Sequence, residues 1–237
     1  MLGRVACMGH DVFAQLNSPW PLFNLQKGRV DYLLDVLVDP RLRARPNKVA
    51  RFLKRRDVLP FIAQEANLTW LKFPPPLALY MDSYSELTDQ LFIHRRNNWR
   101  FCCNYSDLHH TPQFETQFIT EGLMPLESML LQYRRFFSMV RQRWQNVPIV
   151  FLHFPVKLDK RKKFQLRYKC ILDSITQIEK EFQPFYSMMV DEAVVDWPEV
   201  RIPDLEDFPY HYNRATYIAF AGKVRNTGTF DSVIASS

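Results

Sequence analysis

The sequence predicts an α/β domain in which a mainly parallel, flavodoxin-like sheet lies between two layers of helices, a three-layer α/β/α sandwich. Three observations support this fold class. Short apolar runs alternate with longer amphipathic segments along the chain. The run Pro148–Phe154 is apolar without alternation, which is typical of a strand buried on both faces. Polar residues stand where apolar runs stop, at the sheet edge where parallel sheets bind ligands.

Length and composition indicate one packed domain. The chain has 237 residues, of which 47% are hydrophobic and 14% aromatic. No linker or internal repeat marks a boundary, so we expect residues 1–237 to form a single domain. The 6 glycines form neither G-x-G-x-x-G nor a P-loop pattern, which excludes a glycine-rich nucleotide-binding loop.

The first half of the chain contains several elements of modest length. We expect strands over Gly3–Met8, Val58–Ile62 and Leu77–Met81, and helices over Val30–Val38 and Pro46–Arg56. A tight turn at Gly9-His10-Asp11 follows the first strand, and Asp11 stands where it can cap the short helix after it. The polar stretch Asp82–Asp89 follows the third strand, with Glu86 and Asp89 facing solvent or starting a helix.

The second half has stronger periodicity. Arg95–Gly122 is irregular and is expected to run over the surface. Apolar residues three and four apart then predict long helices over Pro125–Asn146 and Asp159–Phe182 and a final helix after Arg214. Strands are expected over Pro148–Phe154 and Phe185–Val190.

The four cysteines suit a reducing compartment. None forms a C-x-x-C pair, so we expect buried free thiols and no zinc or other metal site. The first residues, Met1 to Cys7, lack the basic and apolar regions of a signal peptide, and no apolar run reaches the roughly 18 residues of a membrane span. We therefore expect a cytoplasmic protein without a membrane span.

The net charge of +6 is concentrated in two blocks. One spans residues 41–56, and the other spans Lys157–Lys169 and includes Arg161. Both are consistent with solvated helix faces or with binding of an anion such as a phosphate. No known nucleic-acid-binding signature accompanies them, so nucleic acid is not the expected partner.

The strand ends predict a site. The rule for parallel sheets brings His10, Asp11, the Asp82–Asp89 stretch, His153 and the turn Asp207–His211 to one edge. His211 is the candidate general base and Asp207 its orienting carboxylate. Asp11 can activate water, receive an acyl group or only cap its helix. His10 beside it is either a second acid/base group or a polar turn residue. Asp82, Ser83, Ser85, His153 and Arg161 are candidates for binding substrate.

A family resemblance adds a function to this pattern. His211-Tyr212-Asn213, followed by Tyr217, Ala221 and Val224, is similar to the last block of the SGNH (GDSL) hydrolases. The polar stretch after Leu77–Met81 also resembles polysaccharide-biosynthesis relatives of that fold. The serine of the family's Gly-Asp-Ser block is absent, because the chain has Gly9-His10-Asp11. Asp207 stands four residues before His211, where the family has a spacing of three.

The resemblance implies an esterase or acyltransferase acting on a carbohydrate or small-molecule ester. It implies no cofactor, apart from acetyl-CoA or another acyl donor in the case of a transferase. The missing serine leaves a second hypothesis open, a catalytically inactive binding or regulatory module on the same fold. Binding of polyanions through the basic blocks is a third. The oligomeric state is not predicted.

Overall fold

The central feature of the fold is a parallel sheet with the flavodoxin-like strand order. The computed structural model describes residues 1–25, 28–65, 73–200 and 210–229. Among these residues, five parallel strands form the sheet in the order β2-β1-β3-β7-β8. They are β1 (Leu2–Arg4), β2 (Phe23–Asn24), β3 (Leu79–Asp82), β7 (Ile149–Leu152) and β8 (Phe185–Met188). The strand order reverses between β1 and β3, where such sheets bind ligands.

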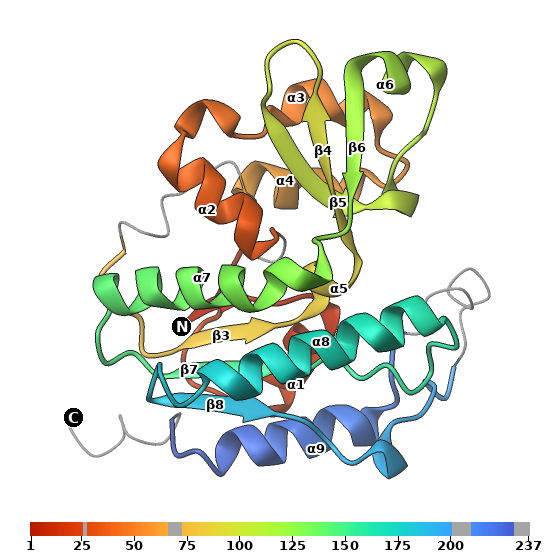
Figure 1. Cartoon of the computed structure of the whole chain (residues 1–237). Helices are drawn as coiled ribbons and strands as arrows, with labels where there is room; N and C mark the ends of the chain where they lie inside the picture. Colours follow the sequence, from red (N-terminus) through yellow and green to blue (C-terminus); the bar gives the residue numbers. More distant parts are fainter. Residues whose placement is uncertain (26–27, 66–72, 201–209, 230–237) are drawn as a thin grey trace.

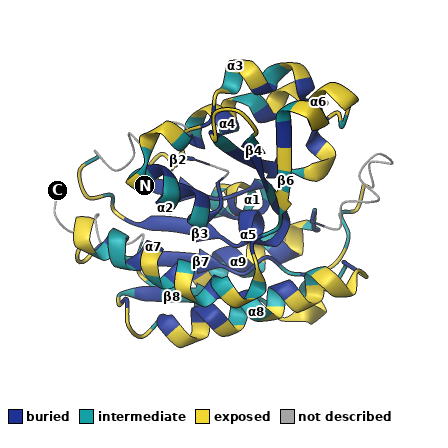
Figure 2. Ribbon diagram, turned by 45° about the horizontal axis from the view of Figure 1, so that its top comes forward, coloured by how far each residue is buried: buried dark blue, intermediate teal, exposed yellow. Residues whose placement is uncertain are grey.

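Two helical layers cover this sheet (Figure 1). Helices α1 (Cys7–Gln15) and α9 (Arg214–Arg225) pack together on one face. On the other face, α7 (Met129–Arg143) packs against both α2 (Val30–Val38) and α8 (Lys162–Ile178). The apolar stripes found in the sequence face inward, and the exposed residues lie mainly on the outer helix faces (Figure 2). The predicted three-layer sandwich is confirmed.

A small antiparallel sheet stands beside the main sheet. Its strands, in the order β5-β4-β6, are β4 (Asp89–His94), β5 (Arg100–Asn104) and β6 (Phe118–Gly122). Its short helices are α3 (Pro46–Val49), α4 (Leu59–Glu65) and α6 (Pro112–Gln117). Helix α5 (Tyr84–Thr88) connects β3 to β4. We call this part of the molecule the cap; it has its own core, in which Phe52, Phe92, Trp99, Phe114 and Phe118 pack together.

The cap overturns several expectations. The prediction of a surface excursion over Arg95–Gly122 was wrong, because this segment supplies β5, α6 and β6. Val58–Ile62 is helical and not a strand; Val58 and Ile62, four residues apart, bury the same helical face in the cap core. The helix expected over Pro46–Arg56 is interrupted at Leu53, which is extended and bridges to Leu108.

The first strand is also shorter than predicted. It ends at Arg4, and α1 already begins at Cys7, so Gly9-His10-Asp11 lies inside the helix and not in a turn. Directly after the strand, the Asn24 side chain takes both backbone groups of Val5, and the amide of Ala6 donates a hydrogen bond of 2.7 Å to the Asp82 carboxylate. Asp11 consequently lies in the second turn of α1 and does not cap it.

The other elements lie close to their predicted positions, and short 3-10 helices complete the chain. These are η1 (Pro40–Leu42), η2 (Ala50–Phe52), η3 (Arg56–Val58), η5 (Tyr105–Asp107), η6 (Leu126–Ser128) and η7 (Glu192–Val194). None of the helices in the described ranges is both long and apolar enough to cross a membrane.

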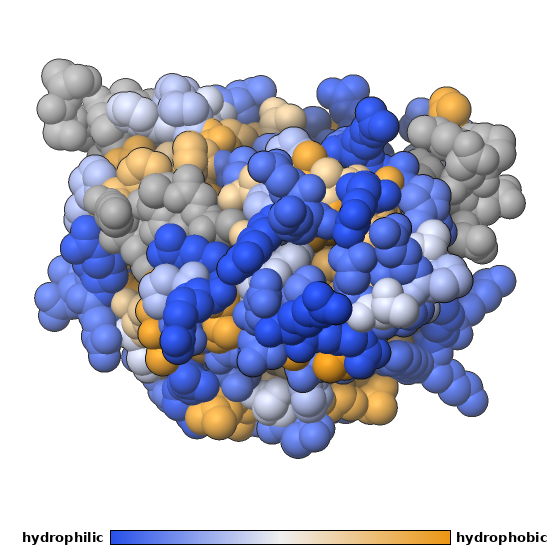
Figure 3. Space-filling view, turned by 90° about the horizontal axis from the view of Figure 1, so that it is seen from above, coloured by the Kyte–Doolittle hydropathy of each residue, from blue (hydrophilic) through white to orange (hydrophobic). Residues whose placement is uncertain are grey.

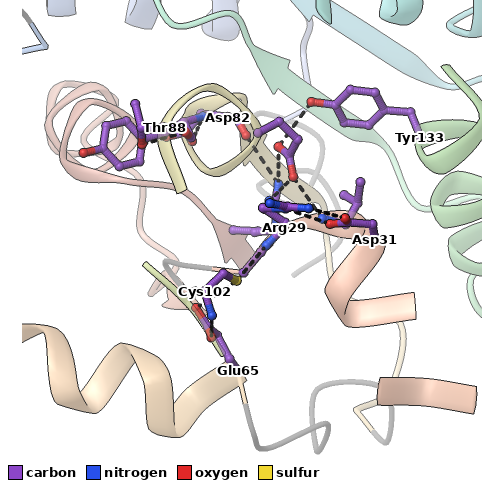
Figure 4. A network of polar contacts seen from close by, with 12 residues as sticks. Arg29, Asp31, Glu65, Asp82, Thr88, Cys102 and Tyr133 are labelled. Atoms are coloured by element: carbon purple, nitrogen blue, oxygen red, sulfur yellow. Dashed lines mark hydrogen bonds and ion pairs between the residues drawn. The ribbon is translucent and has the colours of Figure 1, made fainter. Parts of the chain in front are cut away.

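A buried ionic network joins the cap to the main sheet. Glu86 of α5, which was expected to face solvent or start a helix, is fully buried. Its carboxylate accepts hydrogen bonds from Arg4 at 2.5 Å, from the Val30 amide at 2.9 Å and from the Tyr133 hydroxyl at 3.2 Å. Figure 4 shows Tyr133 and the neighbouring ion pair of Arg29 with Asp31 in this network. Strand β1 and helices α2, α5 and α7 are thereby tied to one carboxylate.

In the first turns of α1, the backbone at Gly9 packs directly against the side chain of Val5. A Cβ atom added there would lie 2.3 Å from the Cβ of Val5. We expect Gly9→Ala to lower the free energy of unfolding by about 1–3 kcal/mol, because steric overlap outweighs the better helix propensity of alanine.

A matched control exists in α9. Nothing lies within 4 Å of a Cβ built at Gly222, so Gly222→Ala should stabilise the protein by about 0.5–1 kcal/mol. Urea unfolding of both variants measures the contrast. Stabilisation by both substitutions would contradict the close packing at Gly9.

Candidate active site

The carboxyl edge of the sheet near β1 and β3 gathers the titratable groups of α1 and the start of α9. We call Cys7, His10, Asp11, His211 and Tyr217 the edge cluster. His10 is exposed, and the other four are partly exposed. The packing of α1 against α9 brings residues from the two ends of the sequence together. The predicted convergence of Asp11 and His211 is therefore present, whereas Asp207 lies outside the described residues.

Cys7 is the first residue of α1 and follows the switch point of the sheet directly. The backbone amides of Cys7 and Met8 in the first helical turn lower the pKa of its thiol. Burial and the carboxylates of Asp82 and Asp11 nevertheless raise the pKa of the thiol to about 12. Cys7 is consequently a neutral thiol at rest, and any nucleophilic role requires a base that removes its proton.

Asp11 lies one helical turn after Cys7 and therefore shares its face of α1. It accepts a hydrogen bond from the hydroxyl of Tyr217 in α9. Burial raises the pKa of Asp11, against the opposing effects of Tyr217, His211 and His10. Because Asp11 interacts electrostatically with both Cys7 and His211, it links the two groups that acyl-transfer chemistry would use.

His211 has the electrostatic properties of a general base. Burial lowers its pKa, the nearby Asp11 carboxylate opposes this shift, and Arg55 of the cap adds to it. The imidazole is therefore neutral at neutral pH and able to accept a proton. Arg55 also pairs with Asp57 at 2.6 Å and lies 3.8 Å from Asp107, so the cap contributes a cation to this region.

The imidazole of His10 contacts Asn24 of β2. Its Nε2 atom lies 2.6 Å from the side-chain amide nitrogen of Asn24, at the end of β2. The Asn24 amide nitrogen can only donate, so Nε2 is the acceptor and the neutral ring carries its proton on Nδ1. Because Asn24 occupies this lone pair, the His10 side chain connects α1 to β2.

Asp82 lies beneath the edge cluster and not on its surface. It is 2% exposed, and its carboxylate accepts hydrogen bonds from the amides of Ala6 and Tyr84 at 2.7 and 3.1 Å. Burial raises the pKa of Asp82 to about 7. Since Ala6 immediately precedes Cys7, Asp82 holds the backbone next to Cys7, and its role in binding substrate stays a prediction.

The two predicted serines are also buried. Ser83 is 0% and Ser85 2% exposed. The Ser83 hydroxyl accepts a hydrogen bond of 3.0 Å from the amide of Phe154, which joins the ends of β3 and β7. Both serines are packed inside the protein and lie outside the edge cluster.

His153 lies at a separate point of the carboxyl edge. It is 1% exposed, and its Nε2 atom lies 2.9 Å from the hydroxyl of Ser187 in β8. Its Nδ1 atom has no hydrogen-bond partner among the described residues. His153 lines a cavity of about 20 Å³ together with Tyr168 and Val195, and burial lowers its pKa to about 4. It is a core histidine.

Arg161 lines another cleft, of about 310 Å³, between the cap and the first turn of α8. It forms an ion pair with Asp159 at 2.8 Å. The hydroxyl of Tyr210, the residue before His211, donates a 2.5 Å hydrogen bond to Asp159. We call this space the α8 cleft. Arg161 thus lies near the chain segment that carries His211, but it belongs to a different surface.

The first basic block is solvated, as the sequence indicated. Its arginines and lysines lie in or beside η1, α3, η2 and η3 of the cap and are partly or fully exposed. Viewed from the side of the cap, the surface is mostly hydrophilic (Figure 3). In the second block Arg167 is buried and donates to the backbone carbonyl of Glu86 at 2.8 Å.

Cys7, Tyr217 and Arg55 were not predicted as site residues. Cys7 was assigned to the interior of a strand, Tyr217 to an apolar helix face and Arg55 to a solvated block. One feature of the sequence favours Cys7 as a site residue. It stands four residues before Asp11, so a helix that begins at Cys7 places both residues on one face.

Within the described residues, no group of three or more His, Cys, Asp or Glu side chains is placed to hold a metal ion. A scan against protein-family models finds no match to the chain. Searches of curated proteins and of solved structures likewise find no similar protein. The functional assignment therefore depends on the geometry of the edge cluster.

Proposed function

We propose that the protein is an acyl-transfer enzyme, an esterase or acyltransferase, in which Cys7 is the nucleophile and His211 the general base. The single observation that supports this most is the position of Cys7 at the switch point of the sheet, on the same helical face as Asp11, which interacts with His211. The ester of a carbohydrate as substrate rests on the resemblance to the SGNH hydrolases alone.

The proposed reaction proceeds in two steps. His211 accepts the thiol proton while the Cys7 sulfur attacks the ester carbonyl, and the first-turn amides of α1 stabilise the negative oxygen that forms. The intermediate collapses, the alcohol leaves with the proton from His211, and the acyl group remains on Cys7 as a thioester. Water or an acceptor hydroxyl then attacks the thioester, His211 takes its proton, and the thiol is restored.

Asp11 supports His211 in this scheme. Its carboxylate favours the imidazolium that forms during each step, while burial keeps the resting imidazole neutral. Tyr217 holds Asp11 in place through its hydroxyl. Asp82 fixes the Ala6–Cys7 backbone from below. The expected pair of His211 with Asp207 stays a prediction.

The decisive experiment is turnover of p-nitrophenyl acetate together with mass spectrometry of the protein. We expect an acetyl group on Cys7, and we expect Cys7→Ala and His211→Asn each to lower kcat/KM by about 10²–10³-fold, because each removes one component of general-base-assisted attack.

Cys170 provides the matched control, because it is a second partly exposed free cysteine. Its sulfur lies 3.4 Å from the carbonyl oxygen of Leu126, away from the edge cluster. Cys170→Ala should retain full turnover. Absence of turnover in the folded parent protein, or equal loss in the Cys7 and Cys170 variants, would refute the enzyme and favour the inactive binding module.

A further inference from the structure

The α8 cleft has the features of a binding site that the proposed reaction leaves unused. Its volume of about 310 Å³ is enough for a small organic molecule. One wall is the first turn of α8 with Arg161 and Lys163, and the opposite wall is the cap strand region with Gln90 and Asn104. Cations therefore face uncharged amide groups across the cleft.

The wall formed by α8 carries unbalanced positive charge. The helix has 17 residues, no acidic residue in its first turn and no side-chain cap from Arg161. Asp159 accepts a hydrogen bond of 3.0 Å from the Arg161 amide and balances the charge of Arg161, so the remaining N-terminal amide groups and the helix dipole add to the charge of Lys163. An anion in the cleft would balance this positive charge.

The two cations of this wall differ in how far they are neutralised. Arg161 uses its Nε and Nη2 atoms on Asp159, while its Nη1 atom has no hydrogen bond among the described residues. Lys163 is exposed and has no ion pair within the described ranges. Since the Arg161–Asp159 pair is neutral overall, Lys163 gives the cleft its net positive charge.

The remaining lining suits a ring with polar substituents. Tyr105 adds an aromatic ring to the lining, and Gln90 and Asn104 offer amide donors and acceptors. The Arg161 guanidinium already lies over the Phe164 ring, at 4.1 Å from its centroid. Tyr105 is already stacked on His110 with ring centroids 3.7 Å apart, which holds its ring in a fixed plane. A sugar or a base can pack on such a surface while its polar groups bind the amides.

We propose that the α8 cleft binds a phosphate-bearing ligand that also carries a sugar or base ring. Lys163, Arg161 and the first-turn amides hold the phosphate, and the cap wall holds the ring. Tyr210, which lines the cleft, directly precedes His211, so one chain segment connects the cleft to the edge cluster. The ligand's role as the donor or acceptor of the acyl group rests on the proposed function, whereas its binding does not.

Isothermal titration at constant ionic strength tests this with three probes: pyrophosphate, uridine diphosphate and glucose 1-phosphate. Binding of all three indicates that phosphate alone is recognised, and tighter binding of one ring-bearing probe identifies the ring. Lys163→Glu should weaken binding by about tenfold or more, the size of one lost charge-assisted hydrogen bond. Asn104→Asp should also weaken it, because it adds negative charge yet keeps the acceptor that caps Ser106 at 3.0 Å.

Lys162→Glu is the matched control, because Lys162 is the exposed neighbour in the same helical turn but does not line the cleft. It should change affinity by about twofold at most, through screened long-range charge. Cys7→Ala should leave binding unchanged, which separates this proposal from the catalytic one. No heat above that of sodium chloride with any probe, or equal weakening by Lys162→Glu and Lys163→Glu, would overturn the proposal.

Discussion

Replacing Glu86 with alanine is expected to lower the free energy of unfolding by about 3–5 kcal/mol, because it leaves a buried guanidinium without its counter-charge. Arg4 is 3% exposed and pairs with Glu86 through two hydrogen bonds, of 2.5 and 3.3 Å. The substitution also removes the acceptor of the Val30 amide and the Tyr133 hydroxyl. Urea unfolding followed by circular dichroism measures the loss.

A double-mutant cycle and a surface pair provide the controls. Arg4→Met together with Glu86→Leu should cost less than the sum of the two single changes, since no charge is left unpaired. Arg134 and Glu181 form an ion pair of 2.8 Å whose side chains are 42% and 43% exposed. Glu181→Ala should cost far less stability than Glu86→Ala, because water screens this exposed pair. An equally small loss for Glu86→Ala would show that the network contributes little to stability.

The second large effect is on the pH dependence of the free energy of unfolding, to which His153 and Asp82 contribute in opposite directions. Burial lowers the pKa of His153 from its ordinary value of 6.5 to about 4. Between these values the unfolded chain binds a proton that the folded protein excludes, so the His153 contribution to stability falls as the pH decreases. At roughly 1.4 kcal/mol per pH unit the total is about 3 kcal/mol.

Asp82 acts in the other direction. Its pKa rises from 3.8 to about 7 on folding. Between these values the folded protein retains a proton that the unfolded chain has lost, so the Asp82 contribution falls as the pH increases, by about 4 kcal/mol in total. The two effects oppose each other over the shared window from about pH 4 to pH 6.5.

Single substitutions should separate these effects. Relative to the parent protein, His153→Gln should gain stability as the pH falls from 6.5 toward 4, and Asp82→Asn should gain stability as the pH rises from 4 toward 7. Each variant also loses some stability at every pH because its hydrogen bonds are altered. The slope of the free energy of unfolding against pH is therefore the quantity to compare. Urea titrations at several pH values supply it. Curves parallel to that of the parent would contradict the two pKa shifts.

The candidate site was only partly predictable from the sequence. The rule for parallel sheets correctly brought Asp11 and His211 together, because it depends on the alternation of strands and helices alone. Cys7 was missed because Gly3–Met8 reads as one apolar run. Nothing local shows that the Asn24 side chain takes the backbone groups of Val5, or that the Asp82 carboxylate, 76 residues away, takes the Ala6 amide.

The polar residues after β3 show the same limitation. Asp82, Ser83, Ser85 and Glu86 are polar residues at the end of an apolar run, a pattern typical of an exposed turn. All four are buried, and the partners of Asp82, Ser83 and Glu86 come from α2, α7, the end of β7 and residues in or next to β1. Burial of a polar group depends on whether distant donors reach it, and spacing along the chain carries no such information.

The sequence by itself determined the layered α/β architecture, the long helices α7, α8 and α9, and the strands β3, β7 and β8. Periodicity and apolar composition are local properties, and each of these elements buries its own apolar face. Only the tertiary structure decided the cap sheet, the true end of β1 and the burial of Glu86. The antiparallel pairing of β4 with β6, and the pairing of Glu86 with Arg4, join residues far apart in the chain. Their stability arises from contacts that exist only after folding.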